Sequence, residues 1–142
     1  MQLDIILRTH DQKSIHHRDF DYDKSDITQR CVNSIHKAID GLDNVSIVTV
    51  DDHSSDETVS MLRNVIHLEG TGNNASLAKV FELAADSKAD LVYLIEDDYL
   101  HYPNAIEEML LTYDKFTEKM ETKDICLNLV DCPAHYHQKQ YV

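Results

Sequence analysis

The chain has 142 residues, of which 42% are hydrophobic; this is the size and composition of one globular domain, and it excludes a disordered class. Its 26 acidic and 13 basic side chains give a formal net charge of −13, which repels nucleic acid and anionic membranes, so neither partner is expected. The three cysteines lack a framework spacing, no signal-peptide pattern opens the chain and no apolar stretch reaches roughly 20 residues. These features predict a soluble cytoplasmic protein without a transmembrane segment.

Residues 3–7 (LDIIL) form an apolar run that predicts a first, central strand. The polar, His-rich stretch that follows, up to Ser25, has neither a helical nor a strand period, so we expect a long loop there. Residues 26–39 carry apolar side chains at helical spacing. They predict a helix with Ser25 as its N-cap and Gly41 just beyond its end.

Residues 45–50 (VSIVTV) predict a second buried strand, which ends in Asp51 and Asp52. The apolar residues Val59, Leu62, Val65 and Ile66 then predict the face of a short helix, followed by a third, short strand at residues 66–68.

A further helix is expected at residues 75–85, after the turn-rich stretch GTGNN. Its inward residues are expected to be Leu77, Val80, Phe81 and Ala84. Residues 91–95 (LVYLI) then predict a strand buried on both faces, which runs directly into three acids, Glu96, Asp97 and Asp98.

The last predicted elements are a helix with Pro103 at its first position and a strand at residues 125–130. Strands that alternate with helices imply a parallel sheet with right-handed crossovers. We therefore expect an α/β fold with about five mostly parallel strands and helices on both faces. No internal boundary is visible, so residues 1–142 are predicted to form a single domain.

Two acidic clusters follow predicted strands at their carboxyl ends, Asp51 with Asp52 and Glu96 to Asp98. In an open α/β sheet, ligands bind outside the carboxyl ends of the strands. If these two strands flank the first one, both clusters and Thr9 face a single crevice. The acids would repel one another, and a hard divalent cation such as Mg²⁺ or Mn²⁺ is the simplest remedy.

Simpler explanations cover part of this pattern. Ser54 with Glu57 fits a capping box, and the acids Asp56 and Glu57 favour the start of a helix. That explanation leaves Asp51 and Asp52 unexplained. The alternative for the second cluster is a solvated strand end.

The motifs resemble those of family 2 glycosyltransferases of the Rossmann-like GT-A fold. DDHSSDET after an apolar strand is similar to their Asp-Asp-Gly-Ser-x-Asp-x-Thr signature, and EDD is similar to their Asp-x-Asp metal motif. IILRTHDQ is similar to their opening strand and loop, which usually carries Thr-Tyr-Asn. The resemblance covers roughly residues 3–115, and the order and spacing of the motifs make it specific.

The resemblance implies a nucleoside-diphosphate sugar as donor, of the UDP type, and an acceptor that it does not identify. Thr9 would lie against the nucleotide, and Asp52 would accept the imide N–H of a uracil-type base, supported by Asp51. Asp97 would lie by the ribose and diphosphate and would share with Asp98 a Mn²⁺ or Mg²⁺ ion that bridges the diphosphate. The remaining donor-binding candidates are Arg8, Asn74 and Ser76, of which Asn74 is also explained as a helix cap or turn residue.

The sequence departs from the family pattern in three ways. His53 replaces the usual Gly, and Arg8 stands where Pro is common. These enzymes also continue beyond the metal motif into an acceptor-binding half with the catalytic base, and nothing here matches that half. Asp131 is the candidate base, and His135 and His137 are candidates to complete the metal shell.

Three functions remain open. The first is a metal-dependent, inverting glycosyltransferase or its donor-binding part, and the second is a nucleotide-sugar-binding fragment that is not catalytic alone. The third is a receiver-like signalling domain with a Mg²⁺ pocket that accepts a phosphoryl group. A receiver needs paired acids after its first strand and a Lys after its last, whereas here the first strand ends in Arg8, Thr9 and His10.

Overall fold

The computed structural model describes residues 1–12 and 23–127. Strands and helices alternate along them, as predicted, and the prediction of an α/β fold is confirmed. In chain order the elements are β1 Leu3–Thr9, α1 Lys24–Ala38, β2 Val45–Asp51, α2 Asp56–Val59, β3 Val65–His67, α3 Asn73–Asp86, β4 Leu91–Glu96 and α4 Ala105–Met120.

The four strands form one parallel sheet in the order β3-β2-β1-β4. The chain lays down β1, β2 and β3 in one direction and then crosses back to place β4 on the other side of β1. β1 is therefore central, and the strand order reverses between β1 and β4, which is the topological switch point where α/β sheets bind ligands.

The expected fifth strand is not found in the described residues. Residues 125–127 are not in a strand, and residues 128–130 lie outside the described residues. An apolar run alone does not make a strand, because a strand also needs a neighbour with which to exchange backbone hydrogen bonds.

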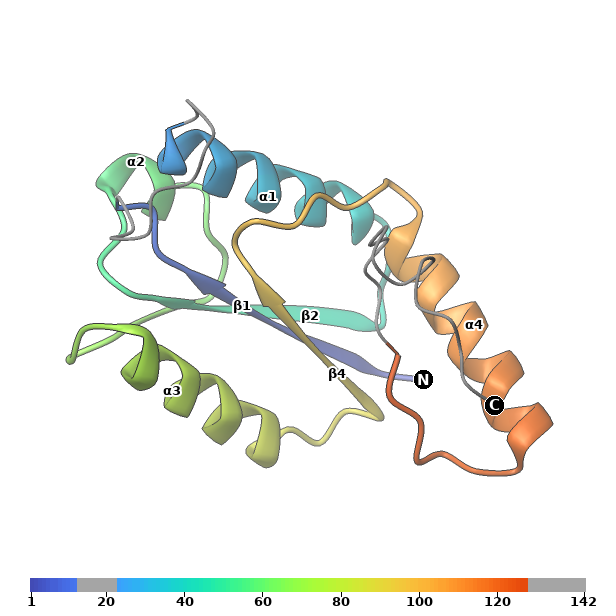
Figure 1. The fold of residues 1–142 in the computed structure, drawn as a ribbon. Helices are drawn as coiled ribbons and strands as arrows, with labels where there is room; N and C mark the ends of the chain where they lie inside the picture. Colours follow the sequence, from blue (N-terminus) through green and yellow to red (C-terminus); the bar gives the residue numbers. More distant parts are fainter. Residues whose placement is uncertain (13–22, 128–142) are drawn as a thin grey trace, which may run out of the picture. The chain divides into compact units, whose positions relative to one another are not determined.

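Helices cover both faces of the sheet (Figure 1), with α1 and α2 on one face and α3 on the other. On the α3 face, Val80 packs with Ile6 and Val50 in a buried apolar cluster. Alternation along β1 sends Leu3, Ile5 and Leu7 to the opposite face, and all three are fully buried. The core of residues 1–104 therefore consists of two apolar layers separated by the sheet.

The ends of α1 and α3 differ from the predictions by one or two residues, but α2 ends at Val59, so the predicted helix face that continues to Ile66 is wrong. The N-cap of α1 is Asp23, whose carboxylate accepts the N–H of Ser25, so the prediction of Ser25 as the cap is wrong. Ser55 caps α2, and α3 begins after Gly72 without a side-chain cap. Polar clusters offer several possible caps, and tertiary contacts decide which one is used.

Two burial predictions are wrong. Phe81 on α3 is 60% exposed rather than inward. In β4 only Ile95 is buried, while Leu94 is 40% exposed. Within the described residues β4 pairs on one side only, with β1, so it lacks the second neighbour of a central strand.

The chain divides into two compact units, residues 1–104 and residues 105–142. In the second unit, α4 begins at Ala105, so Pro103 precedes the helix rather than opening it. Within that unit the Tyr113 hydroxyl donates to the carbonyl of Lys123 at 2.8 Å. No helix in the described part of the chain is long and apolar enough to cross a bilayer.

Candidate functional site

The carboxyl ends of β1, β2 and β4 lie side by side. The prediction that the second and fourth strands flank the first is confirmed, because Thr9 pairs in register with Asp51 and Arg8 pairs with Glu96. Arg8, Thr9 and both acidic clusters therefore gather at one end of the sheet, at the ends of three adjacent strands.

Asp51 and Thr9 form a buried brace between β1 and β2. Thr9 is fully buried and Asp51 is 1% exposed. The Thr9 hydroxyl donates to Asp51 Oδ1 at 3.1 Å, and the backbone N–H of Ser54 donates to the same oxygen at 3.2 Å. Asp51 Oδ2 lies 3.3 Å from Nδ1 of His67. The two side chains are thus used inside the protein, where they fix the ends of both strands.

Asp52 joins the end of β2 to the loop before α3. It is 5% exposed, and its Oδ2 accepts the backbone N–H of Gly72 at 2.9 Å. Its Oδ1 lies 3.1 Å from Nδ1 of His53, and its carbonyl lies 2.8 Å from Nδ1 of His10. The carboxylate is therefore held on both sides.

His53 adopts a left-handed backbone conformation, with φ of 60°. A side chain in this conformation costs about 1–2 kcal/mol relative to the right-handed one, and only glycine escapes that cost. This explains why the similar signature carries Gly here, and it shows that the His53 substitution keeps the turn. The half-exposed imidazole also places a nitrogen beside Asp52 that a glycine would lack.

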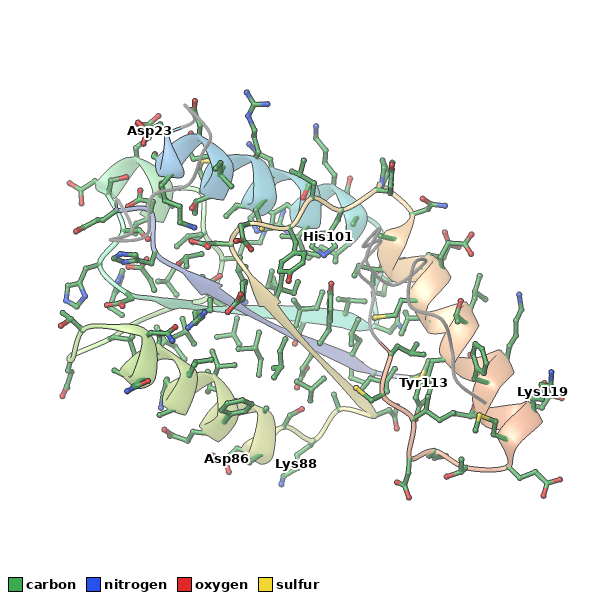
Figure 2. The ribbon with its side chains drawn as sticks, in the orientation of Figure 1. Asp23, Asp86, Lys88, His101, Tyr113 and Lys119 are labelled. Carbon is green, nitrogen blue, oxygen red and sulfur yellow. The ribbon has the colours of Figure 1, made fainter. Side chains whose placement is uncertain are left out.

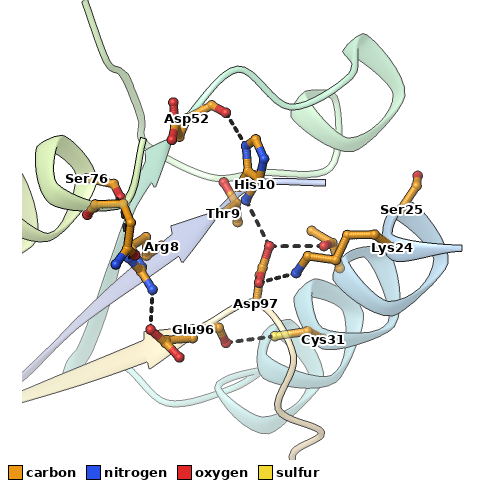
Figure 3. Close-up of polar contacts among 12 residues, drawn as sticks. Arg8, Thr9, His10, Lys24, Ser25, Cys31, Asp52, Ser76, Glu96 and Asp97 are labelled. Atoms are coloured by element: carbon orange, nitrogen blue, oxygen red, sulfur yellow. Dashed lines mark hydrogen bonds and ion pairs between the residues drawn. The ribbon is translucent and has the colours of Figure 1, made fainter. Parts of the chain in front are cut away.

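Arg8 connects β1, β4 and the start of α3 (Figure 3). Its guanidinium forms an ion pair with Glu96 and donates to Asn73 Oδ1. A longer contact of 3.4 Å reaches the hydroxyl of Ser76, which is 2% exposed. The predicted residue Asn74 is exposed in the first turn of α3. The guanidinium N–H groups of Arg8 therefore lie beside the first turn of α3.

The three acids after β4 have three different environments. Asp97 is 8% exposed and accepts three hydrogen bonds: Oδ1 from Lys24 Nζ at 2.5 Å, and Oδ2 from the Thr28 hydroxyl at 3.1 Å and the His10 N–H at 2.8 Å. Glu96 is exposed and pairs with Arg8, and Asp98 is also exposed. Consecutive side chains at a strand end point in different directions, and this separates the acids.

The loop after Asp98 is anchored to α1 and β4. The backbone N–H of His101 donates to the Ser34 hydroxyl at 3.0 Å. The ring nitrogen Nε2 of His101 lies 3.1 Å from the Tyr93 hydroxyl. Burial lowers the pKa of His101 and raises that of Tyr93 to about 12. The Cys31 thiol donates to the carbonyl of Glu96 at 3.6 Å, and burial raises its pKa to about 12. These groups stay neutral near pH 7 and hold the loop without adding charge.

Sequence reasoning missed Asp11 and Lys24. Asp11 is 6% exposed and accepts the N–H of Ser55 at 2.9 Å and its hydroxyl at 2.5 Å. Burial would raise the pKa of Asp11, but the hydrogen bonds from Ser55 and Thr58 outweigh it and leave the pKa below its ordinary value. The sequence does carry a signal for Asp11, because Asp11 occupies the position of Asn in the Thr-Tyr-Asn motif of the similar enzymes. Lys24 lies at the end of the polar stretch and carried no such signal.

The side chains at these strand ends can bind a metal ion only if a bound ligand supplies further donor atoms. Among residues 1–12 and 23–127 no group of three His, Cys, Asp or Glu side chains could hold a metal. Asp97 is occupied by three donors and is buried, whereas the carboxylates of Glu96 and Asp98 are both exposed at this strand end. Magnesium is commonly bound through one or two carboxylates together with substrate phosphates, and that mode fits. Asp131, His135 and His137 lie outside the described residues.

Comparison with known proteins supplies an independent observation. The family model described as "Glycosyl transferase family 2" matches residues 22–122, which include β2 and β4 with both acidic clusters. β1, with Arg8 and Thr9, precedes the matched range. A search of curated proteins finds no match. The model covers well over half of the chain and agrees with the parallel α/β sheet, and so the chain belongs to family 2 of the glycosyltransferases.

Proposed function

We propose that this protein binds a nucleoside-diphosphate sugar, with UDP as the nucleotide, and transfers the sugar to an acceptor with inversion at the anomeric carbon. Family membership supports glycosyl transfer in general and implies a nucleotide-sugar donor and an acceptor. The observation that carries the finer proposal is the placement of both acidic clusters and Arg8 on three adjacent strand ends at the switch point of the sheet.

On the base side, Asp52 accepts the imide N–H of the uracil. A carboxylate is a pure acceptor and suits that N–H group. Its fixed position supports this role, because Gly72 holds one oxygen and His53 flanks the other. Asp51 and Thr9 support Asp52 from inside the protein, since both are buried and are hydrogen-bonded to each other.

On the phosphate side, Arg8, which already pairs with Glu96, offers guanidinium N–H donors beside the first turn of α3. A guanidinium fork matches phosphate oxygens, and Asn74 and Ser76 in the first turn of α3 are further candidates for donor contacts. Asp97 orders the end of β4 near the ribose.

A Mn²⁺ or Mg²⁺ ion would be held by Asp98 together with the diphosphate, with Asp97 as the other candidate ligand. Family 2 enzymes commonly depend on divalent metals. When bound, the ion neutralises charge on the departing nucleoside diphosphate. Asp131, which lies outside the described residues, stays the proposed catalytic base that deprotonates the acceptor.

Calorimetry with UDP and GDP, with and without Mn²⁺, tests the donor site. We expect Mn²⁺-dependent binding of UDP that Asp98→Asn weakens by tenfold or more, about 1.4 kcal/mol. Asp86→Asn is the matched control, because Asp86 is also exposed but lies at the end of α3, before β4 begins (Figure 2). If Asp98→Asn binds UDP with unchanged affinity and metal dependence, the assignment of Asp98 is wrong.

Turnover separates an enzyme from a donor-binding fragment. Hydrolysis or transfer from a UDP-sugar by the 142-residue chain supports the enzyme. Nucleotide binding without turnover supports the fragment. Phosphorylation by acetyl phosphate without nucleotide binding would instead favour a receiver, which the Arg-Thr-His sequence at the end of β1 and the family match both disfavour.

A further inference from the structure

We propose that His53 is a positioning residue for Asp52: its imidazole donates from Nδ1 to the carboxylate and holds it in the orientation in which it selects uracil over cytosine. The inference deepens the proposed function and rests on it for the identity of the base. The similar signature carries a glycine at this place, and a glycine has no side chain with which to hold the acid.

The carboxylate of Asp52 is the first support. Its Oδ2 accepts the backbone N–H of Gly72 at 2.9 Å, and its Oδ1 lies 3.1 Å from Nδ1 of His53. A carboxylate only accepts hydrogen bonds, so this second contact requires the imidazole to carry a proton on Nδ1. The Asp52 side chain is 7% exposed, so little water competes for either oxygen. Each oxygen therefore has a donor from this chain and keeps lone-pair capacity for a ligand.

The backbone of Asp52 is the second support, because it is fixed independently of the side chain. The Asp52 N–H donates to the carbonyl of Thr9 at 2.9 Å. The Asp52 carbonyl lies 2.8 Å from Nδ1 of His10 (Figure 3). With the backbone held at both groups, the orientation of the carboxylate depends on rotation about its side-chain bonds. The hydrogen bonds from Gly72 and His53 restrain that rotation.

The conformation of His53 is the third support. Its φ of 60° is one that glycine adopts freely and that other residues adopt at a cost. Its carbonyl accepts the side-chain amide of Gln12 at 2.8 Å, which ties the turn to the segment after β1. Half of the imidazole stays exposed, so burial contributes little to its presence. Among the residues that the structure describes, the partner of this imidazole is the Asp52 carboxylate.

The orientation of the carboxylate matters because uracil and cytosine differ at one ring nitrogen. Uracil carries a proton on the nitrogen between its two carbonyl groups, whereas the corresponding nitrogen of cytosine carries a lone pair. A carboxylate held toward that nitrogen accepts from uracil and repels cytosine, because two acceptors then face each other unpaired. A carboxylate that rotates away avoids this repulsion. We therefore expect His53 to affect the choice of base more than the affinity for the diphosphate.

Calorimetry with UDP and CDP at pH 8 tests this inference, because the two ligands share the ribose and diphosphate and their affinity ratio isolates the base. His53→Gly keeps the turn but loses the donor, and it should lower the preference for UDP over CDP by about fivefold. His53→Asn keeps an N–H donor and tolerates the left-handed backbone, so its ratio should stay within about twofold of the wild-type value. An unchanged ratio in His53→Gly, or an equal fall in His53→Asn, overturns the proposal.

His67→Ala is the matched control. Nδ1 of His67 lies 3.3 Å from Oδ2 of Asp51, and the His67 side chain is 62% exposed, so this variant removes a comparable imidazole from the neighbouring acid. The ratio of UDP to CDP affinity should keep its wild-type value. A fall as large as that in His53→Gly would assign the effect to the loss of any imidazole at this strand end, and would overturn the proposal.

The position of the ring proton on His53 gives a second decision that needs neither a variant nor a nucleotide. Nitrogen NMR of the nucleotide-free protein at pH 8 should show that proton on Nδ1, where the Asp52 carboxylate accepts it. A proton on Nε2 instead overturns the proposal. Failure of the proposed function would appear separately, as absent UDP binding by the wild-type protein.

Discussion

The hydroxyl of Thr9 is expected to stabilise the fold more than an equivalent hydroxyl elsewhere in the sheet. Thr9→Val removes a hydrogen bond of 3.1 Å to the carboxylate of Asp51, at a position that is fully buried. A hydrogen bond to a charged group contributes about 1.5–3 kcal/mol to stability. We therefore expect Thr9→Val to lower the free energy of unfolding by about 2 kcal/mol.

Thr49→Val is the matched control. Thr49 is also fully buried, on the neighbouring strand β2, and its hydroxyl donates over the same 3.1 Å to the backbone carbonyl of Arg63. Because this acceptor is neutral, the expected loss is about 0.5–1.5 kcal/mol. Equilibrium unfolding in urea at pH 7 compares the two variants, provided that the denaturant slope stays constant. The reasoning is refuted if Thr9→Val costs no more than Thr49→Val.

Three further predictions concern the surroundings of the site. Asp11→Ala should lower the free energy of unfolding by about 2–3 kcal/mol at pH 7, because two hydrogen bonds to a charged carboxylate are lost. The folded-state pKa of Asp11 lies below 3.8, so the stability that its carboxylate contributes is present above that pH and is lost as the pH falls. If Asp11→Ala were still less stable than the wild-type protein by the same amount at pH 2, this reasoning would be contradicted. His53→Gly should be about 1 kcal/mol more stable than His53→Ala, since both variants lose the imidazole but only glycine tolerates the positive φ. Thermal unfolding of the two variants tests this, and equal stability would argue against backbone strain at His53. Cys31 should resist thiol reagents at pH 8 in a Cys126→Ser, Cys132→Ser variant and react once urea unfolds it, because burial raises its pKa to about 12; rapid labelling of the folded protein would show that the thiol is accessible.

The strands were predictable because each is a short apolar run that ends in polar residues. β1, β2 and β4 were located within two residues, and the acids were placed correctly at their carboxyl ends. The number of strands was not predictable in the same way, since the apolar run at residues 125–127 forms no strand in the structure. Hydrophobic patterning shows which residues avoid water, whereas strand formation also requires a neighbour.

The partners of the site residues could not be predicted. The sequence placed Glu96, Asp97 and Asp98 together as one repulsive cluster, but the structure gives Arg8 to the first and Lys24 to the second. These cations come from distant positions in the chain, and no local pattern connects them to the acids. Family membership locates the acidic motifs, while only the folded geometry shows which carboxylate is already neutralised.

The ion pairs of Arg8 and Lys24 with the acids after β4 also set the order in which the site can appear during synthesis. They join residues that are 88 and 73 positions apart in the chain. Closing such long loops loses chain entropy before the contacts compensate for it, so β4 is expected to dock late in folding. A nascent chain that ends before β4 can form the β3-β2-β1 portion of the sheet but has none of these acids. The contacts around Asp97 therefore report that residues 1–104 have folded as a whole.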